Sequence, residues 1–327
     1  MSRTPNNQRS AGRAEAVPQP GSMIDIAAGG TASTLPHNLQ MNPMSFLRFG
    51  CLFAAISLSS SVFAAELQSS DIPRHTQIGT GPIPEGSKAA PSLPADAKLP
   101  SLWLIGDSTV RNGSFGDGTN LNQWGWGAPL VAFFDATKLN VVNRAWGGTS
   151  SRSFYEGWYW KLLKPEIKKG DIVMLQFGAN DNARASLPGT GDETAGVLHT
   201  FGWYLKRYVE DVRAAGATVV ICSLTPRKAW TPEGKFVRDN TTHAAWAAQV
   251  AKEVNAPFID LYELIARRYE ALGLAKVDAL YVPSPTEHLH TGWDGAVVNA
   301  ECVVAGLKAL KDNPLAGFLN ERAAAVK

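Results

Sequence analysis

The sequence carries no excess of charge of either sign. Its 327 residues include 31 Lys and Arg against 29 Asp and Glu, so the formal net charge is only +2. Nucleic-acid-binding surfaces and polybasic membrane arms need blocks of basic residues, which this balance does not supply. We therefore expect no nucleic-acid partner, and small or neutral partners are favoured.

Cysteine is also scarce, with three residues in the whole chain. Cys51 lies in an apolar segment that we expect to be removed, which leaves Cys222 and Cys302. In an exported protein these two could form a disulfide, but nothing in their spacing requires one. Two separate buried thiols are the interpretation that we favour.

Long hydrophobic runs are missing except for one between Met44 and Glu66, MSFLRFGCLFAAISLSSSVFAAE. Arg48 precedes its short apolar part, and small residues near its end are typical of a signal-peptidase site. We predict a signal peptide over residues 44–64, cleaved after Ala64, with export to the periplasm or beyond and no stable membrane association afterwards. An uncleaved anchor is the alternative, but serines dilute the run and it would span a bilayer poorly.

Four regions follow from the change in composition along the chain. Residues 1–43 are interpreted as an over-extended, disordered start, with Met44 as the physiological initiator of the signal peptide. Residues 65–100 are rich in Pro, Gly, Ser and Ala and have too few large apolar residues to fold alone, so we interpret them as an arm or linker. Residues 101–327 are expected to form one domain, because 45% hydrophobic and 18% charged residues can bury one large core.

After Pro100, short apolar runs alternate with segments of helical periodicity, of which the longest is predicted from about Thr194 to Ala215. This alternation is typical of parallel strands joined by crossover helices. It predicts an α/β three-layer sandwich with a central parallel sheet of five strands. The predicted strands lie in the runs 102–106, 140–146, 171–178, 218–224 and 257–261.

Unusual polar residues and glycines follow these strands at the edge where ligands bind in parallel sheets. Ser108 follows the first strand, Gly147-Gly148-Thr149 the second, Asn180-Asp181 the third and the loop 225–230 the fourth. His290 lies in a loop that leads into the last helix. We expect these five segments to converge.

A serine hydroxyl needs a base within hydrogen-bond reach, and usually a third group that orients this base, before it can act as a nucleophile. His290 is the predicted base of Ser108, and Glu287, three residues earlier, is the predicted orienting group. The backbone N–H groups of Ser108 and Gly148 and the side-chain amide of Asn180 are the predicted donors to the oxyanion.

Each feature has a simpler alternative when taken alone. Gly-Asp-Ser is a common turn, the two glycines could form an ordinary loop, and Asn180-Asp181 could cap a helix or form an Asx-turn. His288 and His290 could bind zinc, but no third His or Cys has matching spacing nearby. These alternatives weaken together because all the segments appear in order at successive strand ends.

From residue 102 to 310 these blocks resemble, in order, those of the SGNH (GDSL) hydrolases, and within them rhamnogalacturonan acetylesterase and its bacterial relatives. The resemblance implies a flavodoxin-like sheet, Ser108 as nucleophile, His290 as base, an oxyanion hole that includes Gly148 and Asn180, and no cofactor. Glu287 stands where the family usually has Asp. The motifs that carry the closer likeness are GDST (106–109), NRAWGGTSSRSF (143–154), QFGAND (176–181), SLPGTGDET (186–194), LTPR (224–227) and HTGWDGA (290–296).

Ten tryptophans suggest a substrate with sugar rings, because aromatic faces stack on the apolar faces of sugars. Those expected to flank the site are Trp124, Trp126, Trp146, Trp230 and Trp293, whereas Trp158, Trp160, Trp203 and Trp246 are expected in the core. Arg152 and Arg227 could pair with an acidic sugar or tie loops together. The predicted substrate-binding residues are Asp107, Trp146, Arg152, Asp181, Arg227, Trp230 and His288.

The sequence therefore predicts a secreted, monomeric serine esterase that removes O-acetyl groups from a pectin-type polysaccharide or oligosaccharide, without a metal or cofactor. Two alternatives stay open. One is a broad or lipid-acting GDSL esterase, and the other is a catalytically silent polysaccharide-binding module.

Overall fold

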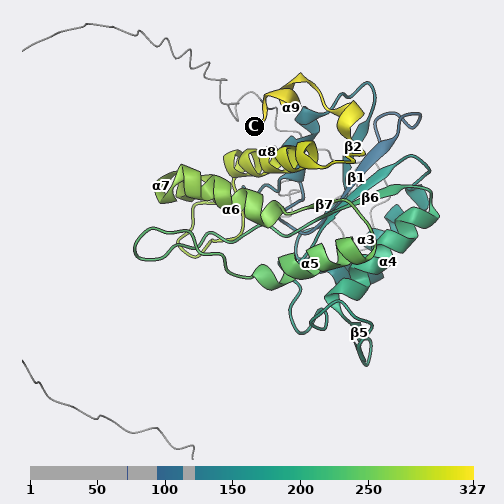
Figure 1. Ribbon diagram of the computed structural model, residues 1–327, viewed down its shortest axis with the longest axis horizontal. Helices are drawn as coiled ribbons and strands as arrows, with labels where there is room; N and C mark the ends of the chain where they lie inside the picture. Colours follow the sequence, from purple (N-terminus) through teal and green to yellow (C-terminus); the bar gives the residue numbers. More distant parts are fainter. Residues whose placement is uncertain (1–71, 73–93, 113–121) are drawn as a thin grey trace, which may run out of the picture. The chain divides into compact units, whose positions relative to one another are not determined.

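The computed structural model describes Ile72 and residues 94–112 and 122–327, so the predictions for residues 1–43 and 44–64 lie outside the described residues. The core is a parallel sheet in the order β2-β1-β3-β6-β7, of which Figure 1 labels β2, β1, β6 and β7. This order is the flavodoxin-like one, and it confirms the predicted three-layer α/β sandwich. The strands are β1 (Ser101–Gly106), β2 (Asn140–Asn143), β3 (Ile172–Gln176), β6 (Thr218–Cys222) and β7 (Phe258–Ile259).

The central strands are apolar at every position between their terminal residues, because both faces of the sheet are covered. Along β1, Leu102 and Leu104 pack into one hydrophobic cluster, while Trp103 and Ile105 pack into the other. This alternation follows from the two-residue period of a strand. β1 pairs with β2 on one side and with β3 on the other, so the ends of these three strands are neighbours.

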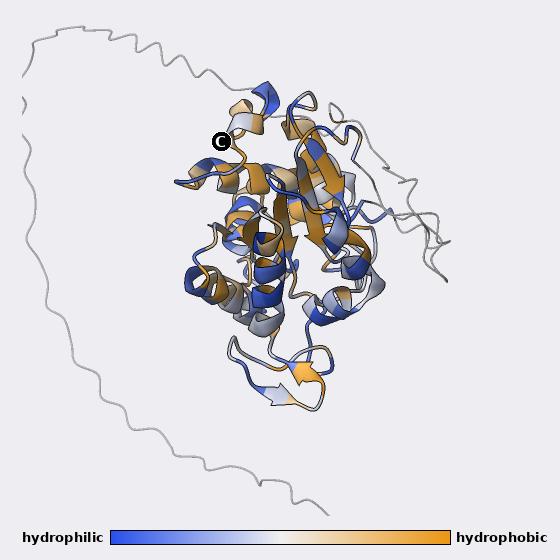
Figure 2. Cartoon of the chain, turned by 90° about the vertical axis from the view of Figure 1, so that its right-hand side faces the viewer, coloured by the Kyte–Doolittle hydropathy of each residue, from blue (hydrophilic) through white to orange (hydrophobic). Residues whose placement is uncertain are grey.

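Helices cover both faces of the sheet, and Figure 2 shows the apolar strands between helices whose outer faces are polar. The cluster on one face includes residues of α1 (Gly127–Leu130), α6 (Leu261–Leu272), α7 (Leu274–Leu280), α8 (Trp293–Ala309) and α9 (Glu321–Ala325). The cluster on the other face includes residues of α2 (Ser151–Glu156), α3 (Trp158–Leu163), α4 (Phe201–Ala214) and α5 (Thr241–Glu253). Trp160 is buried in the second cluster, as predicted.

The long helix predicted from Thr194 begins later than the sequence pattern indicated. Instead, β4 (Thr194–Ala195) and β5 (Leu198–His199) form a small antiparallel hairpin, visible at the bottom of Figure 2. Gly196 lies in its turn with φ of 60°, a conformation that interrupts a helix and that glycine adopts without strain. α4 begins at Phe201, where the Thr200 side chain caps the helix by accepting from the N–H of Trp203 at 3.0 Å.

The two cysteines of the described region, Cys222 and Cys302, are free and buried, as the favoured interpretation predicted. Burial raises the pKa of the Cys302 thiol to about 12, so it stays protonated at physiological pH. Among residues 94–112 and 122–327, no helix has the length and hydrophobicity needed to cross a membrane.

Candidate active site

Ser108 lies in a tight turn directly after β1. The backbone N–H groups of Val110 and Arg111 donate to the carbonyl of Asp107 at 3.2 and 3.1 Å, which folds the chain back. A Cβ atom on Gly106 would lie 2.5 Å from the carbonyl oxygen of Gln176, so only glycine fits between the two strand ends. The turn therefore presents the Ser108 hydroxyl at the carboxyl edge of the sheet.

The structure brings Ser108, His290 and Glu287 together. Ser108 Oγ lies 2.8 Å from His290 Nε2, and His290 Nδ1 lies 3.0 Å from Glu287 Oε2. The other carboxylate oxygen of Glu287 accepts from the backbone N–H groups of Leu289 and His290, both at 2.8 Å. The carboxylate thus holds both the imidazole ring and the loop that carries it.

Glu287 stays ionised near neutral pH. Partial burial raises the pKa of Glu287. Hydrogen bonds from the backbone and ring of His290 and from the backbone of Leu289 lower it by more in total, so the pKa lies below its usual value. An ionised carboxylate accepts a hydrogen bond from the Nδ1–H group, which leaves Nε2 as the acceptor of the Ser108 hydroxyl. This assignment follows from the hydrogen-bond network.

The predicted oxyanion donors lie on three neighbouring strand ends. Gly148 has φ of 78°, which favours glycine, and a Cβ added there would meet nothing within 4 Å. The N–H groups of Ser108 and Gly148 donate to no acceptor among the residues that the structure describes. Asn180 Nδ2 donates to the carbonyl of Thr149 at 3.0 Å, which aligns its amide against the Gly148 loop. That loop is joined to β1 by the N–H of Trp146, which donates to Gly106 at 2.9 Å.

Asp107 and Asp181, predicted to bind substrate, are turned into the fold instead, with exposed fractions of 0% and 5%. Asp107 Oδ1 accepts from the N–H and hydroxyl of Thr109, both at 2.8 Å. Asp181 accepts from the Ser151 hydroxyl at 2.5 Å and from its N–H at 3.1 Å. Burial raises the pKa of Asp107, and it raises that of Asp181 to about 6 although the Ser151 hydrogen bonds act in the opposite direction. Both carboxylates therefore hold strand-end turns, and Asp107 Oδ2 is buried without a hydrogen-bond partner among the described residues.

Two predicted substrate residues lie beside the Gly148 loop. Trp146 is half-buried, and its ring meets that of Trp158 edge-on at 5.1 Å. Arg152, in α2, already pairs with Glu156 one turn away at 2.8 Å. Arg152 therefore has a partner within its own helix.

The loop after β6 lies against the catalytic loop, because the N–H of Lys228 donates to the carbonyl of His288 at 2.7 Å. His288 itself is exposed. In this loop Arg227 Nε and Trp230 Nε1 are buried and have no hydrogen-bond partner among the described residues. Arg227 and Trp230 are half-buried as whole residues, so part of each remains exposed in this loop.

Three of the tryptophans expected to flank the site are core residues instead. Trp126, Trp124 and Trp293 have exposed fractions of 0%, 9% and 4%. Trp124 and Trp293 meet edge-on at 4.9 Å, and the Thr291 hydroxyl donates to the Trp124 carbonyl at 2.8 Å. These rings anchor the segment next to His290 instead of lining an open cleft.

Sequence analysis missed a buried polar chain behind the nucleophile. Trp126 Nε1 donates to Gln176 Oε1 at 2.7 Å, and Gln176 Nε2 donates to Thr109 Oγ1 at 2.8 Å. Thr109 in turn donates to Asp107, next to Ser108. The available signal was a glutamine at the end of an apolar strand, where a buried polar group requires partners.

The zinc alternative is not favoured by the geometry, because both ring nitrogens of His290 already lie within hydrogen-bond distance of Ser108 and Glu287. Among the described residues, no group of three His, Cys, Asp or Glu side chains is arranged to hold a metal ion.

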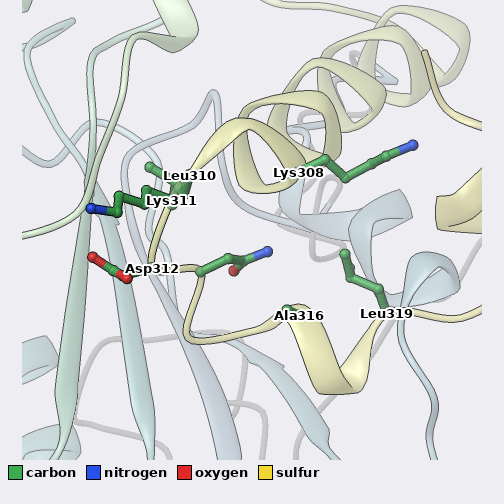
Figure 3. Close-up of a pocket in the computed structure, with 7 residues that line it drawn as sticks. Lys308, Leu310, Lys311, Asp312, Ala316 and Leu319 are labelled. Carbon is green, nitrogen blue, oxygen red and sulfur yellow. The ribbon is translucent and has the colours of Figure 1, made fainter.

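A groove of about 640 Å³ lies elsewhere, at the far end of α8 (Figure 3). α8 begins three residues after His290 and has 17 residues, so its two ends are about 25 Å apart at 1.5 Å per residue. The groove is therefore remote from Ser108. Its lining residues are Lys308, Leu310, Lys311, Asp312, Asn313, Ala316 and Leu319.

Comparison with known proteins gives consistent matches. The family model described as GDSL-like Lipase/Acylhydrolase matches residues 104–292. A rhamnogalacturonan acetylesterase of Emericella nidulans is 29% identical over 234 residues, which cover 67% of this chain and 88% of that protein. The probable rhamnogalacturonan acetylesterase YesY of Bacillus subtilis is 32% identical over 212 residues, or 64% and 93% of the two chains.

Among solved structures, YxiM of Bacillus subtilis superposes with a TM-score of 0.55 at 28% identity. The match covers 64% of this chain and 56% of that one, so the chain spans just over half the length of YxiM.

Proposed function

Because the chain belongs to the GDSL-like lipase/acylhydrolase family and is a carboxylic ester hydrolase, we propose that it removes O-acetyl groups from an acetylated, pectin-type polysaccharide or oligosaccharide. The observation that carries the proposal is the hydrogen bond of 2.8 Å between Ser108 Oγ and His290 Nε2, with Glu287 on the opposite ring nitrogen. An esterase with a serine nucleophile needs this arrangement, whereas a module that only binds polysaccharide does not.

The proposed reaction passes through an acetyl-enzyme. His290 Nε2 takes the proton of Ser108 as Oγ attacks the acetyl carbonyl carbon, and the developing oxyanion is held by Gly148 and Asn180. The tetrahedral intermediate collapses when His290 returns the proton to the sugar oxygen, which leaves as a hydroxyl group. Water, deprotonated by His290, then attacks the acetyl-enzyme, and acetate leaves as Ser108 regains its proton.

The class of substrate is inferred from the relatives and from the loop after β6. Two relatives bear the name of rhamnogalacturonan acetylesterases, one of them as probable. Arg227 is half-buried and lies in a loop that is hydrogen-bonded to the loop of His290 through the carbonyl of His288. A guanidinium group pairs well with a carboxylate, so an acidic sugar such as galacturonate fits this position. Trp146, beside Gly148, supplies an aromatic surface for a sugar ring.

Export and a monomeric state are part of the same proposal. The signal-peptide pattern over residues 44–64 supports export, since an enzyme for polymeric cell-wall substrates must reach them outside the cytoplasm. Ser108, His290 and Glu287 come from one chain and already contact one another. A single chain therefore suffices for the chemistry.

Replacing Arg227 with alanine is expected to lower kcat/KM for an acetylated, galacturonate-containing oligosaccharide by about tenfold, the value of one charge-assisted hydrogen bond. Hydrolysis of p-nitrophenyl acetate, which has no carboxylate, should change by less than about twofold on the same reasoning. Arg152→Ala is the matched control, because that guanidinium is held by Glu156. Equal losses on both substrates would show that Arg227 shapes the loop and does not bind the acidic sugar.

The substrate itself is tested by measuring acetate released from acetylated rhamnogalacturonan, acetylated xylan and acetylated homogalacturonan side by side. We expect the pectin-type substrates to release acetate fastest, and p-nitrophenyl acetate to be preferred over p-nitrophenyl octanoate. Preference for the octanoate would instead indicate a lipid-acting or broad esterase. No release from any ester would indicate a binding module.

A further inference from the structure

The loop that carries Gly148 is held from the end of β3 by two adjacent residues. Asn180 Nδ2 donates to the carbonyl of Thr149 at 3.0 Å. Asp181 accepts from the N–H of Ser151, which lies 3.1 Å from each carboxylate oxygen, and from the Ser151 hydroxyl at 2.5 Å. Gly148 has no side chain and open space around its Cβ position, so the direction of its N–H depends on how residues 149–151 are held.

Ser151 is a fixed point between this loop and the fold. It is fully buried and is the first residue of α2. Its carbonyl accepts from the buried hydroxyl of Tyr208, on α4, at 2.8 Å. Ser151 is therefore held on its carbonyl side by α4 and on its amide and hydroxyl side by Asp181, and the amide side faces the Gly148 loop.

Asp181 is an unfavourable residue for stability at this place. Its side chain is buried, and no Lys, Arg or His side chain in the described part of the chain forms an ion pair with it. Taking an unpaired carboxylate out of water costs free energy, and burial raises the pKa of Asp181 to about 6. Such a residue is better explained by what its hydrogen bonds position than by what they contribute to stability.

We propose that Asp181 is a positioning residue for the oxyanion hole, which fixes the N–H of Gly148 relative to the amide of Asn180 by holding Ser151. The inference rests on the proposed function, because it requires Gly148 and Asn180 to act as oxyanion donors. Asp181 does not touch the substrate. Its carboxylate accepts from both donors of one residue, the Ser151 N–H, which the two oxygens share, and the Ser151 hydroxyl, and this fixes both the position and the orientation of the loop end.

Weakening the contact between Asp181 and Ser151 is expected to lower kcat, but by less than the removal of an oxyanion donor does. Removing an oxyanion donor lowers kcat by about 100- to 1,000-fold, and misplacing a group by about 1 Å costs up to about 100-fold. Asp181→Asn and Ser151→Ala are each expected to lower kcat for p-nitrophenyl acetate by about 10- to 100-fold, with KM within about twofold. Together they should cost little more than either alone, because both break one contact.

The experiment measures kcat per active site, with active sites counted from the burst of p-nitrophenol, and the melting temperature of each variant. Asp211→Asn is the matched control, since Asp211 accepts from Tyr155 Oη at 3.1 Å, Trp160 Nε1 at 2.9 Å and Lys164 Nζ at 2.7 Å, away from the strand ends. It should lower the melting temperature and leave kcat per active site unchanged. Asp181→Asn should lower kcat per active site at pH 7.5 without lowering the melting temperature, because it removes a buried charge.

The proposal is overturned if Asp181→Asn and Ser151→Ala leave kcat per active site as unchanged as Asp211→Asn does, or if their losses multiply in the double variant. Should Asp181→Asn fail to fold, Ser151→Ala alone decides, because it removes only one hydroxyl. Ser108→Ala and Asn180→Ala separate this result from a failure of the proposed function. If those two variants keep full activity, the mechanism itself is wrong, whereas their inactivity beside a fully active Asp181→Asn rejects only the positioning role.

Discussion

Ser108→Ala is expected to lower kcat for ester hydrolysis by about 10⁶-fold, the scale on which other enzymes lose activity with their serine nucleophile. The physical reason is that Ser108 Oγ is the oxygen that His290 Nε2 contacts, at 2.8 Å. Without this oxygen no acetyl-enzyme can form. Only the oxyanion donors and substrate binding then remain to assist attack by water. The measurement is acetate release together with the burst of p-nitrophenol, which should disappear.

The matched control lies on β1, the strand that precedes Ser108. Ser101 is a buried serine at the opposite end of β1, where its hydroxyl accepts from Asn140 Nδ2 at 3.3 Å. Ser101→Ala should retain kcat and lose stability only. His290→Ala should be as inactive as Ser108→Ala, and the double variant should be no worse than either, since the two residues act as one unit. A burst that survives in Ser108→Ala would eliminate the acetyl-enzyme route.

The sheet and the position of the site were accessible from the sequence because both depend on simple periodicities. Strands covered on both faces are apolar along most of their length, so β1, β3 and β6 stand out as apolar runs in the sequence. Parallel connectivity then places every strand end at one edge, where Ser108 and Asn180 come together with the loop of His290. Glu287 was found by its spacing from His290, since a tight turn brings residues three apart into contact.

The direction in which individual side chains point could not be predicted from the sequence in the same way. Neighbours in a strand-end turn point in different directions, so Asn180 lies half-exposed while Asp181 next to it is buried. A high tryptophan content likewise does not indicate which rings are exposed. Trp126 is fully buried, and its Nε1 donates to Gln176. The hairpin at Thr194–His199 was not predicted because the amphipathic pattern of α4 extends in the sequence to residues before Thr200. In the structure the helix starts only after the Thr200 cap, and Gly196 has a left-handed conformation that a helix does not allow.

Glu287→Gln is expected to lower kcat by about 10⁴-fold, the loss seen when an orienting carboxylate becomes an amide. The amide can donate a hydrogen bond to His290 Nδ1, which favours the tautomer with the proton on Nε2. In that tautomer Nε2 cannot accept the Ser108 proton. The length of the side chain is unchanged, so the hydrogen bonds from the backbone of Leu289 and His290 to the remaining oxygen can persist. The loss should therefore fall on kcat, with the loop still folded.

Glu287→Asp separates the effect of the carboxylate charge from the effect of the side-chain length. It keeps the carboxylate but is one methylene shorter, so it should be more active than Glu287→Gln if the tautomer matters most and the loop can adjust. Glu253→Gln is the control, because Glu253 pairs with Lys206 on the helical face away from the strand ends, and kcat should be unchanged. Equal activity of Glu287→Gln and the intact enzyme would remove Glu287 from the catalytic group.

The pH dependence of stability gives an independent check on the same carboxylate. Because the folded-state pKa of Glu287 is lowered below its usual value of 4.5, its contribution to stability is fully present above pH 4.5. That contribution is lost as the pH falls through the folded-state pKa, where the carboxylate takes up a proton. The difference in melting temperature between the intact protein and Glu287→Gln should therefore be largest above pH 4.5 and shrink in more acidic solution. A difference that stays constant across this range would mean that Glu287 is not ionised in its contact with His290.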